Sequence, residues 1–191
     1  MDVKGHPRKP LECESLPMAS LVDSFLAETA VEDPPLHGYL EKLDDEGRRL
    51  LAGVLGRFDQ KGHGALDPSQ RLLARRVLSR LRRPDREILA LANRVLDYLD
   101  LNRNALLEES ELELTIEIME LFSHIETDND TLSGRELEML YVVLRHVDTN
   151  DNGVIDAHEK THLRQGLDDP VAFLAEQRAQ NPELKKILDE R

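Results

Sequence analysis

The chain has 191 residues, of which 40% are hydrophobic and only 4% aromatic, so its core must be built from aliphatic side chains, mainly leucine. The formal net charge of -13 argues against general nucleic-acid binding and is consistent with acids that await cations. The single cysteine, Cys13, excludes an intramolecular disulfide, no apolar run approaches the ~20 residues of a membrane span, and residues 1–20 lack the apolar core of a signal peptide. We therefore expect a soluble, cytoplasmic protein without a membrane span.

The N-terminal part of the chain predicts a loose arm followed by helices. Residues 1–19 contain one glycine and three prolines and show little periodicity. A short helix is predicted from Ser20 to about Thr29, and Pro34 and Pro35 then indicate a linker. Apolar residues at helical spacing predict one helix over 38–58, although three glycines weaken it.

Two further helices are predicted in the middle of the chain. Asp67 is a predicted N-cap with Pro68 at the first helical position, and this helix is expected to run to about Arg83. Pro84 is expected to begin the next helix, which leads to Asp100. Residues 112–122 fit both strand alternation and one helical face; a helix is favoured because the segment follows a loop of the kind described below.

The last third of the chain predicts a helix over 134–147 and another over 158–165, which Gly166 would end as a C′ glycine. Asp169 with Pro170, and Asn181 with Pro182, each read as an N-cap followed by a proline at the first helical position. They predict two short helices at the end of the chain.

The segment from Asp148 to Glu159 matches the calcium-loop pattern D-x-[DN]-x-[DN]-G-x5-E at every specified position. Ca²⁺ takes about six to eight oxygen ligands, and a loop of about twelve residues can wrap one ion when alternate side chains point inward. Gly153 stands where such a loop turns sharply. The candidate ligands are Asp148, Asn150, Asn152, the carbonyl of Val154, Asp156 through water, and Glu159 with both carboxylate oxygens.

This segment resembles the calcium loops of the EF-hand family, and the resemblance extends to residues 100–111. The resemblance implies ligands Asp100, Asn102, Asn104, the carbonyl of Leu106, Glu108 and Glu111. Ala105 stands at the glycine position, where left-handed geometry costs a non-glycine residue about 1–2 kcal/mol. We expect a weaker or more rigid site there.

A third copy, residues 59–70, keeps Asp59 and Gly64 but places Lys61 and His63 where oxygen ligands are needed. Gln70 replaces the closing carboxylate. Because an ammonium group repels a divalent cation, this copy is predicted to have kept the fold and lost the metal.

A fourth segment, residues 126–136, also resembles the pattern but lacks its glycine. One helix of chain, Leu137 to Val147, would hold it about 16 Å from Asp148, so it cannot pair with the loop there. The favoured interpretation is a linker in which Ser133 caps the next helix and Glu136 completes a capping box.

The sequence thus predicts an all-α protein with three EF-hands, one of them degenerate, plus an EF-like linker and short terminal helices. The expected organisation is an N-terminal arm over 1–37, an EF-hand domain over 38–167 and a C-terminal helical extension over 168–191. EF-hands normally pair. The pairing of loops 100–111 and 148–159 is favoured, with Ile155 in a short β-bridge; the pairing of 59–70 with 100–111 remains open.

The residues His158-Glu159-Lys160-Thr161-His162 form H-E-x-x-H, the motif of zinc proteases. Glu159 is already the proposed closing ligand of the calcium loop, and one carboxylate cannot readily chelate Ca²⁺ and also act as a general base. We therefore expect no enzymatic activity.

A block of eight arginines between Arg71 and Arg94 either offsets the acidic 95–140 region or docks an acidic partner. Only Met119 and Met139 are left to line a target-binding groove of the calmodulin type, so a leucine-lined groove for one protein target is the alternative. The leading hypothesis is an intracellular Ca²⁺ sensor or buffer with two sites, at which Mg²⁺ competes. The alternative is a helical interaction or regulatory module with structural Ca²⁺.

Overall fold

The computed structural model describes residues 16–124 and 130–189, and the regular structure within these ranges consists of ten helices. The all-α prediction is confirmed. In chain order the helices are α1 (Leu16–Glu32), α2 (Pro34–Leu40), α3 (Asp45–Gly56), α4 (Pro68–Leu78), α5 (Arg86–Leu99), α6 (Glu109–Ser123), α7 (Gly134–Val147), α8 (Ala157–Asp168), α9 (Pro170–Gln180) and α10 (Pro182–Asp189). Within the described ranges, no helix has the length and apolar character that would let it span a bilayer.

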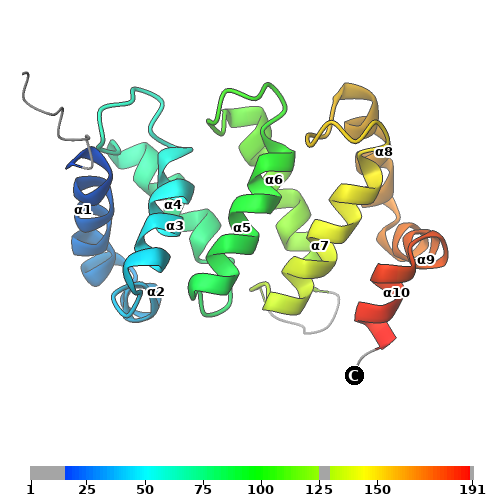
Figure 1. Cartoon of the computed structure of the whole chain (residues 1–191), viewed down its shortest axis with the longest axis horizontal. Helices are drawn as coiled ribbons and strands as arrows, with labels where there is room; N and C mark the ends of the chain where they lie inside the picture. Colours follow the sequence, from blue (N-terminus) through cyan, green and yellow to red (C-terminus); the bar gives the residue numbers. More distant parts are fainter. Residues whose placement is uncertain (1–15, 125–129, 190–191) are drawn as a thin grey trace, which may run out of the picture.

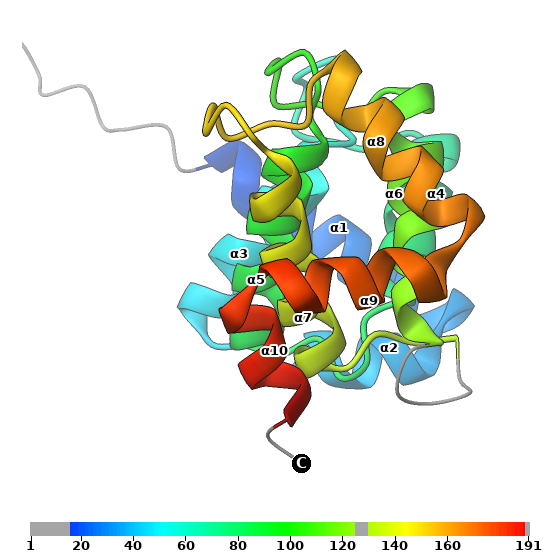
Figure 2. The ribbon, with the colours of Figure 1, turned by 90° about the vertical axis from the view of Figure 1, so that its right-hand side faces the viewer.

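Three helix–loop–helix units stand side by side along the molecule (Figure 1). The units are α3–α4, α5–α6 and α7–α8, and their connecting loops all lie at the same edge, at the top of Figure 1. The first helices α3, α5 and α7 form one layer and the second helices α4, α6 and α8 form the other (Figure 2). Helices α1 and α2 close one end of the row, and α9 and α10 close the other.

The units follow one another head to tail. The N–H of Leu107 in the second loop donates to the carbonyl of Arg57 in the first unit at 2.7 Å. In the same way, the N–H of Ile155 in the third loop donates to the carbonyl of Tyr98 in the second unit at 2.9 Å. Both acceptors lie two residues before the first residue of their own loop. The short β-bridge expected at Ile155 is therefore wrong: its N–H bonds to the end of a helix in the preceding unit, and the same one-way link recurs at Leu107.

The opposite edge of the row carries a second link. Leu81 and Leu132, from the two connections between units, form an isolated parallel bridge, with the N–H of Leu132 donating to the carbonyl of Arg80 and the N–H of Arg82 donating to the carbonyl of Leu132. This bridge ends α4 at Leu78, earlier than the predicted Arg83, because the chain must extend to pair with the neighbouring connection.

One hydrophobic core runs through all three units and both ends. It includes Phe25 of α1, Phe122 of α6 and Leu184 of α10, and most of its members are leucine, as the composition predicts. Burial of this apolar surface is the main force that holds the row together.

Two predictions near the N-terminus are wrong. Pro34 and Pro35 do not form a linker but occupy the first turn of α2, where Asp33 accepts a hydrogen bond from the N–H of Leu36 at 3.1 Å. The helix predicted over 38–58 is divided at 41–44, because Asp44 caps a new helix by accepting from the N–H of Gly47 at 2.8 Å. The predicted arm lies mostly outside the described residues, and α1 already begins at Leu16.

The predicted helix starts and ends elsewhere are confirmed with two exceptions. Pro84 does not begin α5, which starts at Arg86 because Asp85 is its N-cap and accepts from the N–H of Ile88 at 3.0 Å. Ser133 and Glu136 form the predicted capping box, and Asp169 and Asn181 cap α9 and α10. Gly166 does not end α8 but lies inside it, where a Cβ atom would collide with the ring of Phe173. The segment 112–122 is helical as predicted, within α6.

Candidate functional site

The loops 59–70, 100–111 and 148–159 each join the first helix of a unit to its second helix (Figure 1). In each loop the first residue is the end of one helix or follows it closely, and the last residue lies in the first turn of the next helix. In the loops 100–111 and 148–159 the fold brings the last candidate ligand within hydrogen-bond distance of the residue that follows the first ligand, although ten positions separate these two residues.

Asp148 organises the loop 148–159. Its side chain is 5% exposed, and its two oxygens accept hydrogen bonds from the N–H of Asn152 at 3.0 Å and of Gly153 at 2.8 Å. Gly153 has φ +84, which only glycine adopts without strain. The loop is thus folded around the first carboxylate.

The side-chain oxygens of the two asparagines lie along the same turn. Oδ1 of Asn150 accepts from the N–H of Asn152 at 3.1 Å, and Oδ1 of Asn152 accepts from the N–H of Val154 at 2.9 Å. Nδ2 of Asn150 donates to Oδ2 of Asp156 at 3.0 Å, which joins the third and ninth positions of the loop. Hydrogen bonds from the N–H groups of Glu159 and His158 and from the Asn150 side chain lower the pKa of Asp156, so this carboxyl stays ionised at neutral pH.

Glu159 closes the loop from the buried side, with 2% of its surface exposed. Its Oε1 accepts from the N–H of Thr149 at 2.8 Å and from the Thr149 hydroxyl at 3.0 Å, and its Oε2 accepts from the N–H of Asp156 at 3.0 Å. Asp156 and Glu159 also form the capping box of α8. The carboxylate therefore bridges the start and the end of the loop.

The loop 100–111 repeats this arrangement. Asp100 accepts from the N–H of Asn104 at 3.1 Å and of Ala105 at 2.8 Å, and Glu111 accepts from the N–H of Leu101 at 2.8 Å and of Glu108 at 2.9 Å. The asparagine oxygens accept from the residue two positions further on, at 3.0 Å for Asn102 and 2.8 Å for Asn104. Nδ2 of Asn104 donates to Glu108 at 3.1 Å.

A left-handed backbone at the fourth and sixth positions is common to all three loops. The sixth position is Gly64, Ala105 or Gly153, and the fourth is Gly62, Arg103 or Asp151, with φ between 53 and 84 in every case. Three of these six residues carry a side chain, which costs about 1–2 kcal/mol each in this region. The loops share one backbone conformation that local propensity alone does not favour.

The loop 59–70 has the same frame without the same side chains. Asp59 accepts from the N–H of His63 at 3.2 Å and of Gly64 at 2.7 Å, and Gln70 accepts from the N–H of Asp67 at 2.9 Å. Hydrogen bonds from Ser69 and from the N–H of Gln70 lower the pKa of Asp67. Lys61 is exposed, with Nζ 3.9 Å from Asp67. The frame therefore forms where the third and fifth positions offer no oxygen.

The described residues contain no group of three or more His, Cys, Asp or Glu side chains arranged to hold a metal ion. Each candidate loop instead combines three carboxylates with two asparagine amides and a main-chain carbonyl, and its closing glutamate is turned toward main-chain N–H groups. The donors are all oxygen, which fits a hard divalent cation. A carboxylate oxygen has two acceptor sites, so an oxygen that accepts a single N–H bond keeps one site for a metal contact. Oε1 of Glu159 accepts two bonds from Thr149, so chelation of an ion by both oxygens of Glu159 requires it to give up one of these bonds.

Other motifs from the sequence have a structural explanation. His158 and His162 lie on one side of α8, and His162 contacts the ring of Phe173 edge-on at 6.2 Å between centroids. The segment 126–136 lies partly outside the described residues, and its described end caps α7.

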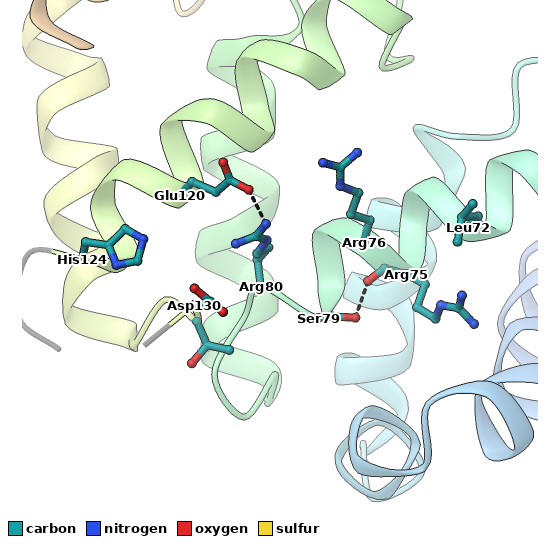
Figure 3. A pocket seen from close by; sticks show the side chains of 9 residues that line it. Leu72, Arg75, Arg76, Ser79, Arg80, Glu120, His124 and Asp130 are labelled. Atoms are coloured by element: carbon teal, nitrogen blue, oxygen red, sulfur yellow. Dashed lines mark hydrogen bonds and ion pairs between the residues drawn. The ribbon is translucent and has the colours of Figure 1, made fainter. Parts of the chain in front are cut away.

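Three of the eight arginines in the block form ion pairs with acids of other helices. Arg71 and Arg75 of α4 form ion pairs with Glu28 and Glu32 of α1, and Arg80 pairs with Glu120 of α6. Only the last of these acids belongs to the 95–140 region that the sequence suggested. An open cavity of about 740 Å³ lies between α4 and α6, and Figure 3 shows that Arg76, Arg80 and Arg75 point in different directions around it. Its guanidinium groups therefore do not converge on one anion.

Sequence reasoning missed one residue of the loop region. Nη2 of Arg103 donates to the main-chain carbonyl of Asn152 at 2.6 Å, so a side chain of the second loop holds the backbone of the third. No motif indicates this contact, because the two residues lie 49 positions apart.

No family model, no curated protein and no solved structure matches this chain.

Proposed function

We propose that the protein binds two Ca²⁺ ions, one in the loop 148–159 and one in the loop 100–111. The observation that carries the proposal is the comparison with the loop 59–70. That loop keeps the first aspartate, the left-handed backbone and the helix cap with Lys61 and His63 at its third and fifth positions. The turn therefore does not require asparagine at these positions, and Asn102, Asn104, Asn150 and Asn152 need another reason, which a cation supplies.

The ligands follow loop positions one, three, five, seven, nine and twelve. In the loop 148–159 they are Asp148, Asn150, Asn152, the carbonyl of Val154, Asp156 through water, and Glu159. In the loop 100–111 they are Asp100, Asn102, Asn104, the carbonyl of Leu106, Glu108 and Glu111. Two neutral amides in each set give a moderate ligand charge, which corresponds to dissociation constants on the order of 10⁻⁷–10⁻⁵ M. Mg²⁺ competes less well, because it prefers a rigid octahedral shell at about 2.0–2.1 Å.

The choice among a sensor that captures helices, a buffer and a structural role depends on whether apolar surface opens when the ion binds. Met119 and Met139 are 2% and 1% exposed, and among the described residues the exposed large hydrophobic side chains are Val31, Tyr39 and Leu72, which lie on three different helices. These positions do not form a leucine-lined groove. Binding of a fluorescent hydrophobic dye with and without Ca²⁺ distinguishes the roles, because only a sensor exposes apolar surface when the ion binds.

Isothermal calorimetry of the full chain tests the proposal. We expect two Ca²⁺ per wild-type chain, and one per chain in both Glu159→Gln and Glu111→Gln, since each substitution removes the charge of one closing carboxylate. Glu113→Gln on the exposed side of α6 makes the same change in net charge and should leave the stoichiometry at two. Uptake of less than one ion by the wild-type chain would overturn the proposal, and unchanged stoichiometry in both closing-ligand variants would show the ligand assignment to be wrong.

A further inference from the structure

Arg103 is the residue that joins the two proposed sites through a side chain. It occupies the fourth position of the loop 100–111, with φ +59, between the proposed ligands Asn102 and Asn104. Its guanidinium donates to the carbonyl of Asn152 at 2.6 Å. The residue whose main chain it contacts, Asn152, uses Oδ1 to accept from the N–H of Val154 within its own loop.

The contact is specific to this pair of loops. The first loop has Gly62 at the same position and therefore no side chain that could reach the second loop. The third loop has Asp151 there. Each pair of neighbouring units has a main-chain link, from Leu107 to Arg57 or from Ile155 to Tyr98. The side-chain contact of Arg103 with Asn152, in contrast, joins the two loops that have a complete set of proposed ligands.

We infer that Arg103 is a positioning residue for the cation site of the loop 148–159 and that it couples this site to the loop 100–111. The inference rests on the proposed function. A cation in the loop 100–111 would fix Asn102 and Asn104, and with them the residue between them. Arg103 would then hold the backbone of Asn152 in place. An ion in the loop 100–111 therefore lowers the conformational entropy that the loop 148–159 loses when it binds its own ion. By linkage, an ion in the loop 148–159 raises the affinity of the loop 100–111 by the same factor.

Removal of Arg103 has two effects on Ca²⁺ affinity, and they act in opposite directions: loss of its positive charge and loss of its hydrogen bond to Asn152. A guanidinium near two cation sites repels Ca²⁺, so loss of its charge alone would tighten both sites, and mostly its own. Loss of the hydrogen bond instead weakens the loop 148–159 selectively. The net worth of one exposed hydrogen bond corresponds to about a three- to tenfold change in affinity. The direction of the change therefore distinguishes the two effects.

The test is a Ca²⁺ titration followed by ¹H–¹⁵N NMR, in which the amides of Ala105 and Gly153 report on the two loops separately. Both amides donate to the first aspartate of their loop. Arg103→Gln should weaken binding at Gly153 about three- to tenfold, with less change at Ala105, and the effect should persist in about 1 M KCl, where charge effects are screened. Arg49→Gln, near the start of α3 and paired with Glu46, makes the same change in net charge and should have no effect.

Two further variants complete the test. Arg103→Lys keeps the charge and loses the planar donor group, so it should fall between wild type and Arg103→Gln. Glu111→Gln, which disables the site in the loop 100–111, should lower the Ca²⁺ affinity of the loop 148–159 in the wild-type background but not in the Arg103→Gln background. Equal or tighter binding at Gly153 in Arg103→Gln overturns the inference and leaves the proposed function intact. Failure of the wild-type chain to bind Ca²⁺ overturns both.

Discussion

The ring of Phe173 in α9 packs directly against the main chain of Gly166 in α8, and a Cβ atom at Gly166 would collide with three of its ring atoms. Alanine is normally preferred to glycine inside a helix by about 0.5–1 kcal/mol. At this position the collision outweighs that preference, because overpacking a core typically costs about 1–3 kcal/mol.

Gly166→Ala is therefore expected to lower the free energy of unfolding by about 1–2 kcal/mol in urea titrations. Gly38→Ala is the matched control, since Gly38 lies inside α2 with no atom close to the added methyl group. It should raise the free energy of unfolding by about 0.5–1 kcal/mol. Equal effects of the two substitutions would show that Phe173 does not determine the packing of α8 and α9.

The capping box of α7 gives a second prediction. Ser133 accepts from the N–H of Glu136 at 3.2 Å, and the buried Glu136 side chain accepts from the N–H of Ser133 at 2.8 Å. Ser133→Ala should destabilise the protein by about 1 kcal/mol, measured by thermal or urea unfolding. Ser110→Ala, in the exposed first turn of α6, should change stability by less than about 0.5 kcal/mol.

The left-handed backbone at the sixth loop position gives a third prediction. Ala105→Gly removes strain of about 1–2 kcal/mol but increases the freedom of the unfolded chain, so a net gain in stability of about 0.5–1 kcal/mol is expected without metal. Gly153→Ala, where φ is +84, should lose a similar amount. If both substitutions change unfolding in the same direction, the backbone conformations of the two loops are not equivalent.

Removal of metal gives a fourth prediction, which depends on the proposed function. Free Ca²⁺ at about one hundred times the dissociation constant should stabilise the chain by about 2.7 kcal/mol for each occupied site, and excess EDTA should abolish the gain. Glu159→Gln and Glu111→Gln should each lose the share of one site. A melting temperature that does not respond to Ca²⁺ in the wild-type protein would contradict this expectation.

The low pKa of Asp67 gives a prediction about pH. Hydrogen bonds from Ser69 and from the N–H of Gln70 favour the ionised carboxyl and hold its folded pKa below its usual value of 3.8. Its contribution to stability is therefore complete above pH 3.8 and is lost as the pH falls through the lower folded value. The difference in melting temperature between wild type and Asp67→Asn should be greatest near neutral pH and shrink below about pH 4. A difference that grows in acid would mean that the folded state raises this pKa.

Signals within a few residues of one another were readable from the sequence. Ser133 with Glu136, Asp169 with Pro170 and Asn181 with Pro182 mark helix starts because a cap depends only on the next three or four residues. The same locality explains why Asp148, Asn150 and Asn152 could be assigned to one turn. The linker predicted at Pro34 and Pro35 was wrong because two prolines suit both a linker and the first turn of a helix. The N-cap Asp33, which accepts from the N–H of Leu36, favours the helix.

Features that depend on distant residues could not be read in this way. Gly166 has the sequence context of a helix end, and only the ring of Phe173 shows why it lies inside α8. The end of α4 is set by the bridge between Leu81 and Leu132, which lie in different units. The contact of Arg103 with Asn152 likewise exists only because the second and third loops are stacked on the same edge.

The one-way links from Leu107 to Arg57 and from Ile155 to Tyr98 make the row of units a modular, quasi-one-dimensional stack. A two-fold pair is closed once it has formed, whereas a head-to-tail stack accepts any number of members between its two terminal covers. Three units therefore satisfy this architecture as well as two or four would. A tandem duplication of residues 86–133 would add a fourth unit that contacts its neighbours on both sides in the same way as the present ones. The number of units is therefore not limited by symmetry.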